Sequence, residues 1–215
     1  MSIDPIASRL AGEGVTFAPA IANAARRYRL DPDLLAAVAA QETGGPDSNA
    51  GRNVVGDGGH GRGVFQIDDR WHTFASTPAA MDPAQNADYA AGMISGLIKR
   101  YGGNVHEALS AYNAGSPTAT GTTTRWSDGT ELGYADSVLR HYHRLNGESP
   151  QSAAVAESGE AIASVGALQS RAQSLPLAPP MSAPYLFAPH SARGYREQTT
   201  DYLALLDSDN DEKNS

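Results

Sequence analysis

Residues 30–46 read LDPDLLAAVAAQETGGP and contain the strongest helix signal in the chain. Asp31 suits the N-cap and Pro32 the first helical position, because an aspartate side chain accepts an unpaired amide hydrogen and proline has none to satisfy. Two glycines and a proline follow Glu42, and both residue types disfavour continuation of the helix. The stretch therefore predicts a short helix that begins at Asp31 and has Glu42 in its last turn.

Glu42 lies on the apolar side of this predicted helix. Leu34, Val38 and Glu42 are spaced four residues apart, so their side chains share one stripe. Burial and the negative end of the helix dipole both favour the protonated carboxyl, which is the form that a general acid needs. The helix by itself also fits a glutamate that points into solvent, so the interpretation depends on the residues that follow.

Apolar residues at helical spacing predict a mainly helical domain with about five helices and little sheet. Further helices are expected over 16–29, from Asp82 to Tyr101, from Asn104 through Tyr112, and over 134–145, while residues 44–66 are rich in glycine and predict a wrapped loop with a short hairpin. The chain then divides into an N-terminal extension (1–15), a folded domain (16–146) and a tail (147–215).

The tail is rich in alanine, serine and proline and lacks a periodic apolar face until Tyr202–Leu206. Such a segment buries too little apolar surface to offset its ordering entropy, so we expect it to be mostly disordered or bound to a protein partner. Tyr202–Leu206 fits a docking helix or a transient turn.

Composition excludes several classes of function. The formal net charge is −8 and no cluster of lysine and arginine occurs, which argues against binding to nucleic-acid phosphates. No run approaches the roughly 20 apolar residues of a membrane span, and the first residues lack a secretory signal. Cysteine is absent and the histidines do not cluster with carboxylates, so we expect no metal and no cofactor.

Three further motifs follow Glu42 in order. Residues 56–68 read GDGGHGRGVFQID, residues 109–115 read LSAYNAG, and residues 134–138 read YADSV. Together with the glutamate they resemble the goose-type lysozymes, and the second motif is shared by that family and the lytic transglycosylases. The resemblance covers roughly residues 20–146. Thr43 and Val64-Phe65 depart from the commoner serine and Leu-Met at these positions, and the second change alters the floor of the expected cleft.

The resemblance implies a lysozyme-like fold with a cleft for alternating N-acetylmuramic acid and N-acetylglucosamine. In it Glu42 is the catalytic acid, and Asp57 and Asp68 hold the attacking water. From their residue types alone, Asp57 also fits a turn and Asp68 a helix cap.

Other residues of the motifs are candidates for contact with the sugar. The amides of Gln66 and Asn113 can hydrogen-bond N-acetyl and hydroxyl groups, and the phenols of Tyr112 and Tyr134 can orient Glu42, although Tyr134 fits the core equally well. Trp71 and Trp126 can stack on sugar faces or lie buried. These residues are the predicted substrate-binding set.

The leading interpretation is a muramidase that hydrolyses the bond between N-acetylmuramic acid and N-acetylglucosamine in peptidoglycan. The first alternative is a lytic transglycosylase, in which the C6 hydroxyl of the sugar attacks and leaves a 1,6-anhydro end, so that no water needs to be held. The second is a structural component of a virion or secretion machine. Without an export signal, we expect delivery to the cell wall by a phage, a virion or a secretion apparatus.

Overall fold

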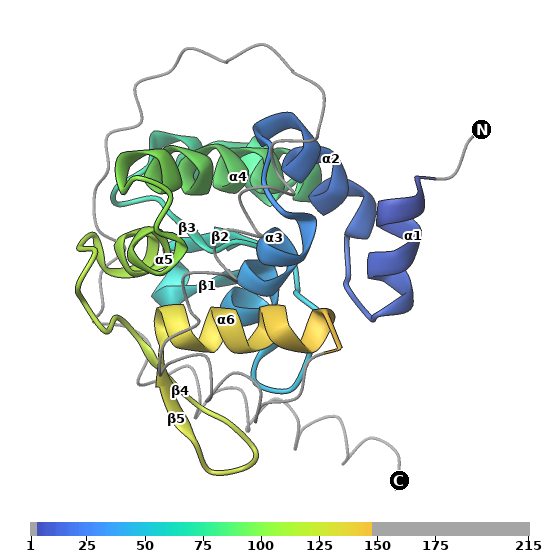
Figure 1. Ribbon diagram of the computed structural model, residues 1–215. Coiled ribbons are helices and arrows are strands. Elements are labelled where there is room, and N and C mark those ends of the chain that lie inside the picture. The colour runs from blue at the N-terminus through green and yellow to red at the C-terminus, as the bar shows by residue number, and fades with distance from the viewer. Residues whose placement is uncertain (1–3, 148–215) are drawn as a thin grey trace, which may run out of the picture.

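The structure is a computed structural model that describes residues 4–147, a mainly helical domain with two small antiparallel sheets (Figure 1). The helices are α1 (Pro5–Gly12), α2 (Ala18–Tyr28), α3 (Pro32–Ala39), α4 (Pro83–Arg100), α5 (Val105–Ala114) and α6 (Tyr134–Leu145). The strands are β1 (Val54–Gly56), β2 (Gly61–Gly63), β3 (Ile67–Asp68), β4 (Thr123–Arg125) and β5 (Glu131–Gly133). A π-helical turn (Ala40–Gly44) continues α3, and short 3₁₀ turns span Asp57–Gly59, Thr73–Ser76 and Pro78–Met81. The predicted helical architecture is confirmed.

Three helices begin with the same dipeptide, an aspartate at the N-cap followed by proline. Asp4, Asp31 and Asp82 each accept a backbone amide hydrogen of the first turn, at 2.8–3.0 Å. Each carboxylate thereby satisfies a donor that has no partner inside the helix. Helices were expected at the starts of α3 and α4, whereas α1 begins with the same dipeptide inside the predicted N-terminal extension, where no helix was expected.

Helix α3 is the centre of the fold. Residues 34–39 are each at most 2 % exposed, because α1, α2 and α6 all pack against this helix. Figure 1 shows α3 in the middle of the domain, with α4 and α2 on one side and α6 on the other. A helix that is apolar on every side must be covered on every side, and three alanines allow its neighbours to approach closely. Its C-terminal end carries Glu42.

An ion pair between the partly exposed Arg9 and the buried Asp33 attaches α1 to this central helix. Asp33 is 1 % exposed and accepts a hydrogen bond from Arg9 Nη2 at 2.6 Å. Burial opposes the charged guanidinium, but the carboxylates of Asp33 and Glu13 outweigh it and raise the pKa of Arg9. The first helix is thus part of the core and more than an extension.

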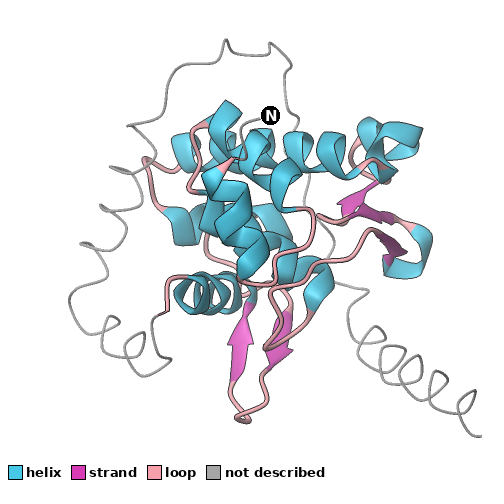
Figure 2. Cartoon of the chain, turned by 90° about the vertical axis from the view of Figure 1, so that its right-hand side faces the viewer, coloured by secondary structure: helices cyan, strands magenta, loops and turns pink. Residues whose placement is uncertain are grey.

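The two sheets lie apart from each other on the helical body (Figure 2). In the first, β2 pairs with both β1 and β3, with Val54 opposite Gly63 and Gly61 opposite Asp68. The second is a hairpin of β4 and β5 that the sequence analysis did not predict. No helix among residues 4–147 is long and apolar enough to cross a membrane.

The side chain of Asn86 in α4 binds the backbone of the first sheet. Its side chain is fully buried, accepts the amide hydrogen of Phe65 at 2.9 Å, and donates to the carbonyls of Arg62 and Ala80 at 3.0 Å. A Cβ atom on Gly63 would collide with this amide, so the close approach requires glycine there. The glycine-rich stretch is therefore tied to a rigid helix. The tail after residue 147, including Tyr202–Leu206, lies outside the described residues.

Candidate functional site

The chain changes from α- to π-helical geometry where it reaches Glu42. The amide of Gly45 donates to the carbonyl of Ala40 at 3.0 Å, an i to i+5 bond that defines the turn Ala40–Gly44. Thr43 fastens this turn to the glycine-rich stretch, because its hydroxyl lies 3.0 Å from the carbonyl of Val64 and accepts the amide hydrogen of Arg52 at 2.8 Å. Such π turns occur often at functional sites. Here the turn carries Glu42 and directly follows the most buried helix of the fold.

The Glu42 carboxyl is partly exposed and has a defined hydrogen-bond donor. The hydroxyl of Tyr134 donates to Glu42 Oε1 at 2.6 Å, and Tyr134 is itself only 1 % exposed. The backbone of Tyr134 is held in turn, because its amide donates to the carbonyl of Thr120 at 2.9 Å. The proposed role of Tyr134 in orienting Glu42 is thus supported by a direct contact across 92 residues of sequence.

Tyr112, the second phenol expected near Glu42, also contacts the stretch that leads to Asp68. Its hydroxyl donates to the carbonyl of Phe65 at 3.0 Å, so it supports the turn before Asp68. Burial, and after it the negative charge of Glu42, raises the pKa of Tyr112 well above its usual value. Its phenol therefore stays protonated, and its ring packs beside that of Tyr134 with centroids 6.3 Å apart.

Gln41, which the sequence analysis did not single out, connects the Glu42 turn to α6 and to the second sheet. Its amide donates to Thr124 Oγ1 at 2.8 Å and accepts from Ser137 Oγ at 2.6 Å. Ser137 also accepts from the indole of Trp126 at 3.2 Å. Trp126 is 1 % exposed, so it belongs to the core and offers no face to a sugar.

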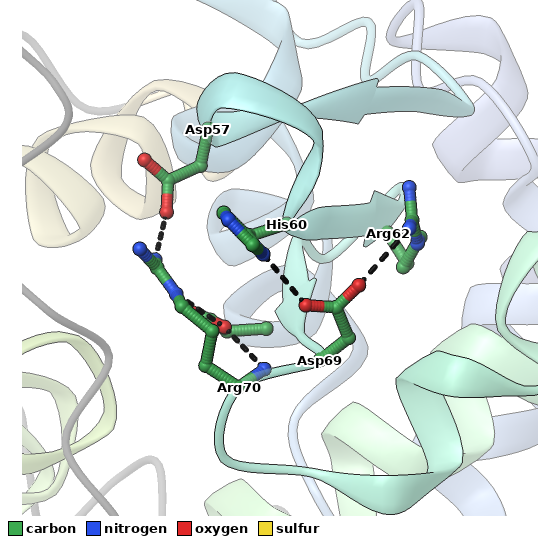
Figure 3. A network of polar contacts seen from close by, with 6 residues as sticks. Asp57, His60, Arg62, Asp69 and Arg70 are labelled. Carbon is green, nitrogen blue, oxygen red and sulfur yellow. Dashed lines mark hydrogen bonds and ion pairs between the residues drawn. The ribbon is translucent and has the colours of Figure 1, made fainter.

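Asp57 and Asp68, predicted as the water-holding pair, converge on the guanidinium of Arg70, and Figure 3 shows its contact with Asp57. Arg70 donates through Nε to both carboxylate oxygens of Asp68, at 2.9 and 3.1 Å, and through Nη2 to Asp68 and Asp57. These contacts raise the pKa of Arg70, with the hydrogen bond to Asp68 as the largest cause. The structure therefore brings the two aspartates together around a fixed positive charge.

A second set of charges lies beside the first. Asp69 accepts from Arg62 Nη2 at 3.0 Å and contacts His60 Nδ1 at 2.8 Å (Figure 3). The ligand atoms of His60, Asp68 and Asp69 lie within 4.8 Å of one another, so the expectation that no histidine clusters with carboxylates is wrong for His60. Arg62 and Arg70 already neutralise these carboxylates, which disfavours a cation in the same place.

Gln66 and Asn113 use their amides inside the protein. Gln66 donates to the carbonyls of Val54 and Gly63, at 3.1 and 2.7 Å, and its backbone has a φ of 47°. Asn113 accepts the amide hydrogen of Thr122 at 2.9 Å. Both residues are more than nine-tenths buried, so their first task is to shape the loops around the site.

Trp71 is the tryptophan that remains available to a ligand. It is 44 % exposed and directly follows Arg70. An exposed indole next to a charged cluster is a suitable face for a sugar ring. Of the two tryptophans considered for stacking, the structure thus favours Trp71.

Arg70 is the main functional candidate that the sequence analysis missed. Its backbone amide donates to Asp68 Oδ1 at 2.8 Å, which forms a tight turn over residues 68–70. Because of this turn, the guanidinium of Arg70 contacts the same carboxylate. An aspartate followed two residues later by arginine at the end of a strand was a visible signal for this turn. The additional contact with Asp57 depends on the sheet and has no local signal.

Comparison with known proteins agrees with this geometry. The family described as transglycosylase SLT domain matches residues 19–130, which is more than half of the chain. Protein IpgF of Shigella flexneri is 31 % identical over 134 residues, an alignment that covers 60 % of this chain and 82 % of the relative. No solved structure matches significantly.

The family match and the site together identify a lysozyme-like, glycosidase-type enzyme that acts on peptidoglycan of the cell wall. The resemblance seen in the motifs is confirmed at the level of the domain. The chain belongs to the transglycosylase SLT domain family.

Proposed function

We propose that this chain is a muramidase, which uses water to cleave the β-1,4 bond between N-acetylmuramic acid and N-acetylglucosamine. The observation that carries the proposal is the convergence of Asp57 and Asp68 on Arg70. Hydrolysis needs an ionised carboxylate that accepts hydrogen bonds from the attacking water, whereas attack by the sugar's own hydroxyl does not need a held water. The guanidinium of Arg70 compensates the negative charge of both carboxylates, which lets them lie close together.

In the proposed reaction Glu42 supplies the proton. The carboxyl of Glu42 protonates the glycosidic oxygen as the bond from that oxygen to C1 of the muramic acid breaks. Water forms the new bond to C1 from the opposite face of the ring, and its proton passes to an aspartate of the pair. The hydrogen bond from Tyr134 holds the Glu42 carboxyl in a fixed orientation.

The remaining site residues take supporting roles in this proposal. Tyr112 and Gln66 hold the turn between Gly63 and Asp68 through their bonds to backbone carbonyls. Asn113 uses its oxygen to hold Thr122, which leaves its NH₂ group as the candidate donor to an N-acetyl group. Trp71 supplies an apolar face for a sugar ring.

A lytic transglycosylase is the second candidate, and the family match itself favours it. That reaction would use the same acid, Glu42, and would break the same bond. Its product differs, because the C6 hydroxyl closes a 1,6-anhydro ring on the muramic acid. The nature of the new sugar end therefore separates the two candidates.

Mass spectrometry of the sugar ends released from purified peptidoglycan tests the proposal. A muramidase leaves reducing N-acetylmuramic acid ends, and exclusive 1,6-anhydro ends would overturn the hydrolytic function. Asp57→Asn and Asp68→Asn should reduce the rate, because water is then held less well. Asp69→Asn is a matched control on the same loop, since Asp69 pairs with Arg62 and His60 instead of Arg70.

A further inference from the structure

We propose that Arg70 gives the two aspartates, Asp57 and Asp68, different roles in the reaction. Asp68 anchors the guanidinium, and Asp57 is the carboxylate that receives the proton of the attacking water. Arg70 is then a positioning residue, which acts on the reaction through Asp57. This inference rests on the proposed hydrolytic function and assigns separate roles within the pair.

The two carboxylates differ in how many hydrogen bonds they accept from Arg70. Both oxygens of Asp68 are occupied: Oδ1 accepts the backbone amide and Nε, and Oδ2 accepts Nε and Nη2. Its side chain is also only 5 % exposed. A carboxylate that is buried and already holds several donors has little capacity left for a water molecule.

Asp57 has the opposite properties. Only its Oδ2 contacts Arg70, and within residues 4–147 its Oδ1 accepts no hydrogen bond. Its side chain is 14 % exposed, so water can reach it. The backbone of Asp57 has a φ of 48°, in the left-handed region that non-glycine residues seldom adopt. An oxygen without a partner, on a residue held in an unusual conformation, suits a group that must accept a proton at a fixed place.

Arg70 holds the two carboxylates in place because its guanidinium contacts both. Its fork spans the two carboxylates, which lie 11 residues apart in sequence and would repel each other without a cation between them. Lysine has a single charged nitrogen and cannot reproduce the fork. Arg62 is a natural comparison, because it holds Asp69 in the same sheet and has no contact with Asp57 or Asp68.

Chemical rescue by azide distinguishes a residue that accepts a proton, as proposed for Asp57, from one that only holds Arg70, as proposed for Asp68. Asp57→Ala removes the acceptor and leaves space in which azide can attack C1, while Glu42 still protonates the departing oxygen. The C1–O bond breaks, a C1–N bond forms, and the product is a glycosyl azide of inverted configuration. No acceptor is required, because azide carries no proton to lose.

We expect Asp57→Ala to lose about 100-fold or more in rate and to recover with azide, with glycosyl azide found by mass spectrometry. Asp68→Ala should lose rate without recovering, since its defect is a misplaced Asp57. Arg70→Gln should lose about 100-fold in kcat with a smaller change in KM, and Arg70→Lys should restore little of it. Arg62→Gln and Asp69→Ala should keep the wild-type rate and show no azide product.

Recovery of Asp68→Ala by azide to the same extent as Asp57→Ala would overturn the division of roles, as would a wild-type rate for Arg70→Gln. Circular dichroism of each variant identifies one that is unfolded, and the Arg70 variants test the inference independently if Asp68→Ala fails to fold. The sugar ends left by the wild-type protein test the hydrolytic function separately. Exclusive anhydro ends overturn that function, whereas reducing ends without selective azide rescue overturn only the role of Arg70.

Discussion

His141 should make the folded protein sensitive to acid. It lies in α6, is fully buried, and packs against Trp126 with ring centroids 4.7 Å apart. Neither ring nitrogen has a hydrogen-bond partner within residues 4–147. Burial is the largest cause that lowers its pKa from 6.5 to about 3; the charges of Arg144 and Arg140 add to the effect, and Asp47 opposes it.

The magnitude follows from the difference in proton binding. Above pH 6.5 the ring is neutral in both states, so it contributes nothing to the pH dependence of stability. Between pH 6.5 and pH 3 the unfolded chain binds a proton that the folded chain excludes, so the free energy of unfolding falls as the pH falls. From pH 7 to pH 5 this one residue should cost about 2 kcal/mol of stability.

Denaturant unfolding of wild type and His141→Leu at pH 7 and pH 5 measures this cost. Leucine is apolar, does not titrate and suits the neighbouring indole. The wild type should lose about 2 kcal/mol more than His141→Leu over this range. His143→Leu is the control on the same helix, where the native side chain is partly exposed. If wild type and His141→Leu lose equal stability on acidification, His141 is protonated in the folded state and the reasoning is wrong.

Three further predictions test the site and the core. Glu42→Gln keeps the shape of the side chain and removes the acid, so wall-lysis rates should fall about 100-fold or more while circular dichroism is unchanged. Tyr134→Phe removes the 2.6 Å contact with Glu42; turbidity assays should show about a tenfold loss of kcat, and a wild-type rate would exclude an orienting role. Arg9→Leu removes the cation that contacts the buried carboxylate of Asp33, so thermal unfolding should show a loss of about 1–2 kcal/mol, most of it restored by Asp33→Asn in the same chain.

Local signals account for what the sequence predicted well. The Asp-Pro starts of α3 and α4 depend on residues within one helical turn, and the cap of α5 at Asn104 is equally local, because its side chain accepts the amide hydrogen of Glu107 at 3.1 Å. Likewise the position of Glu42 at the end of an apolar helix followed from local signals, namely the apolar spacing before it and the two glycines and proline after it.

The sequence could not predict which distant groups each polar side chain would hydrogen-bond in the folded protein. An amide such as that of Gln66 or Asn113 has the same donors and acceptors whether it meets a sugar or a nearby carbonyl, and only the folded backbone decides between them. The same is true of Tyr112, whose hydroxyl lies 47 residues from its acceptor. Arg70 was missed because its contact with Asp57 requires three strands in register.

The burial of α3 has a consequence for how this protein loses activity. Amide groups in the least exposed helix open to solvent only when the whole domain unfolds, so their hydrogen exchange reports the global free energy of unfolding. Glu42 is joined to that helix without a loop between them. If Glu42 is the acid as proposed, heat inactivation should therefore coincide with the cooperative loss of the fold.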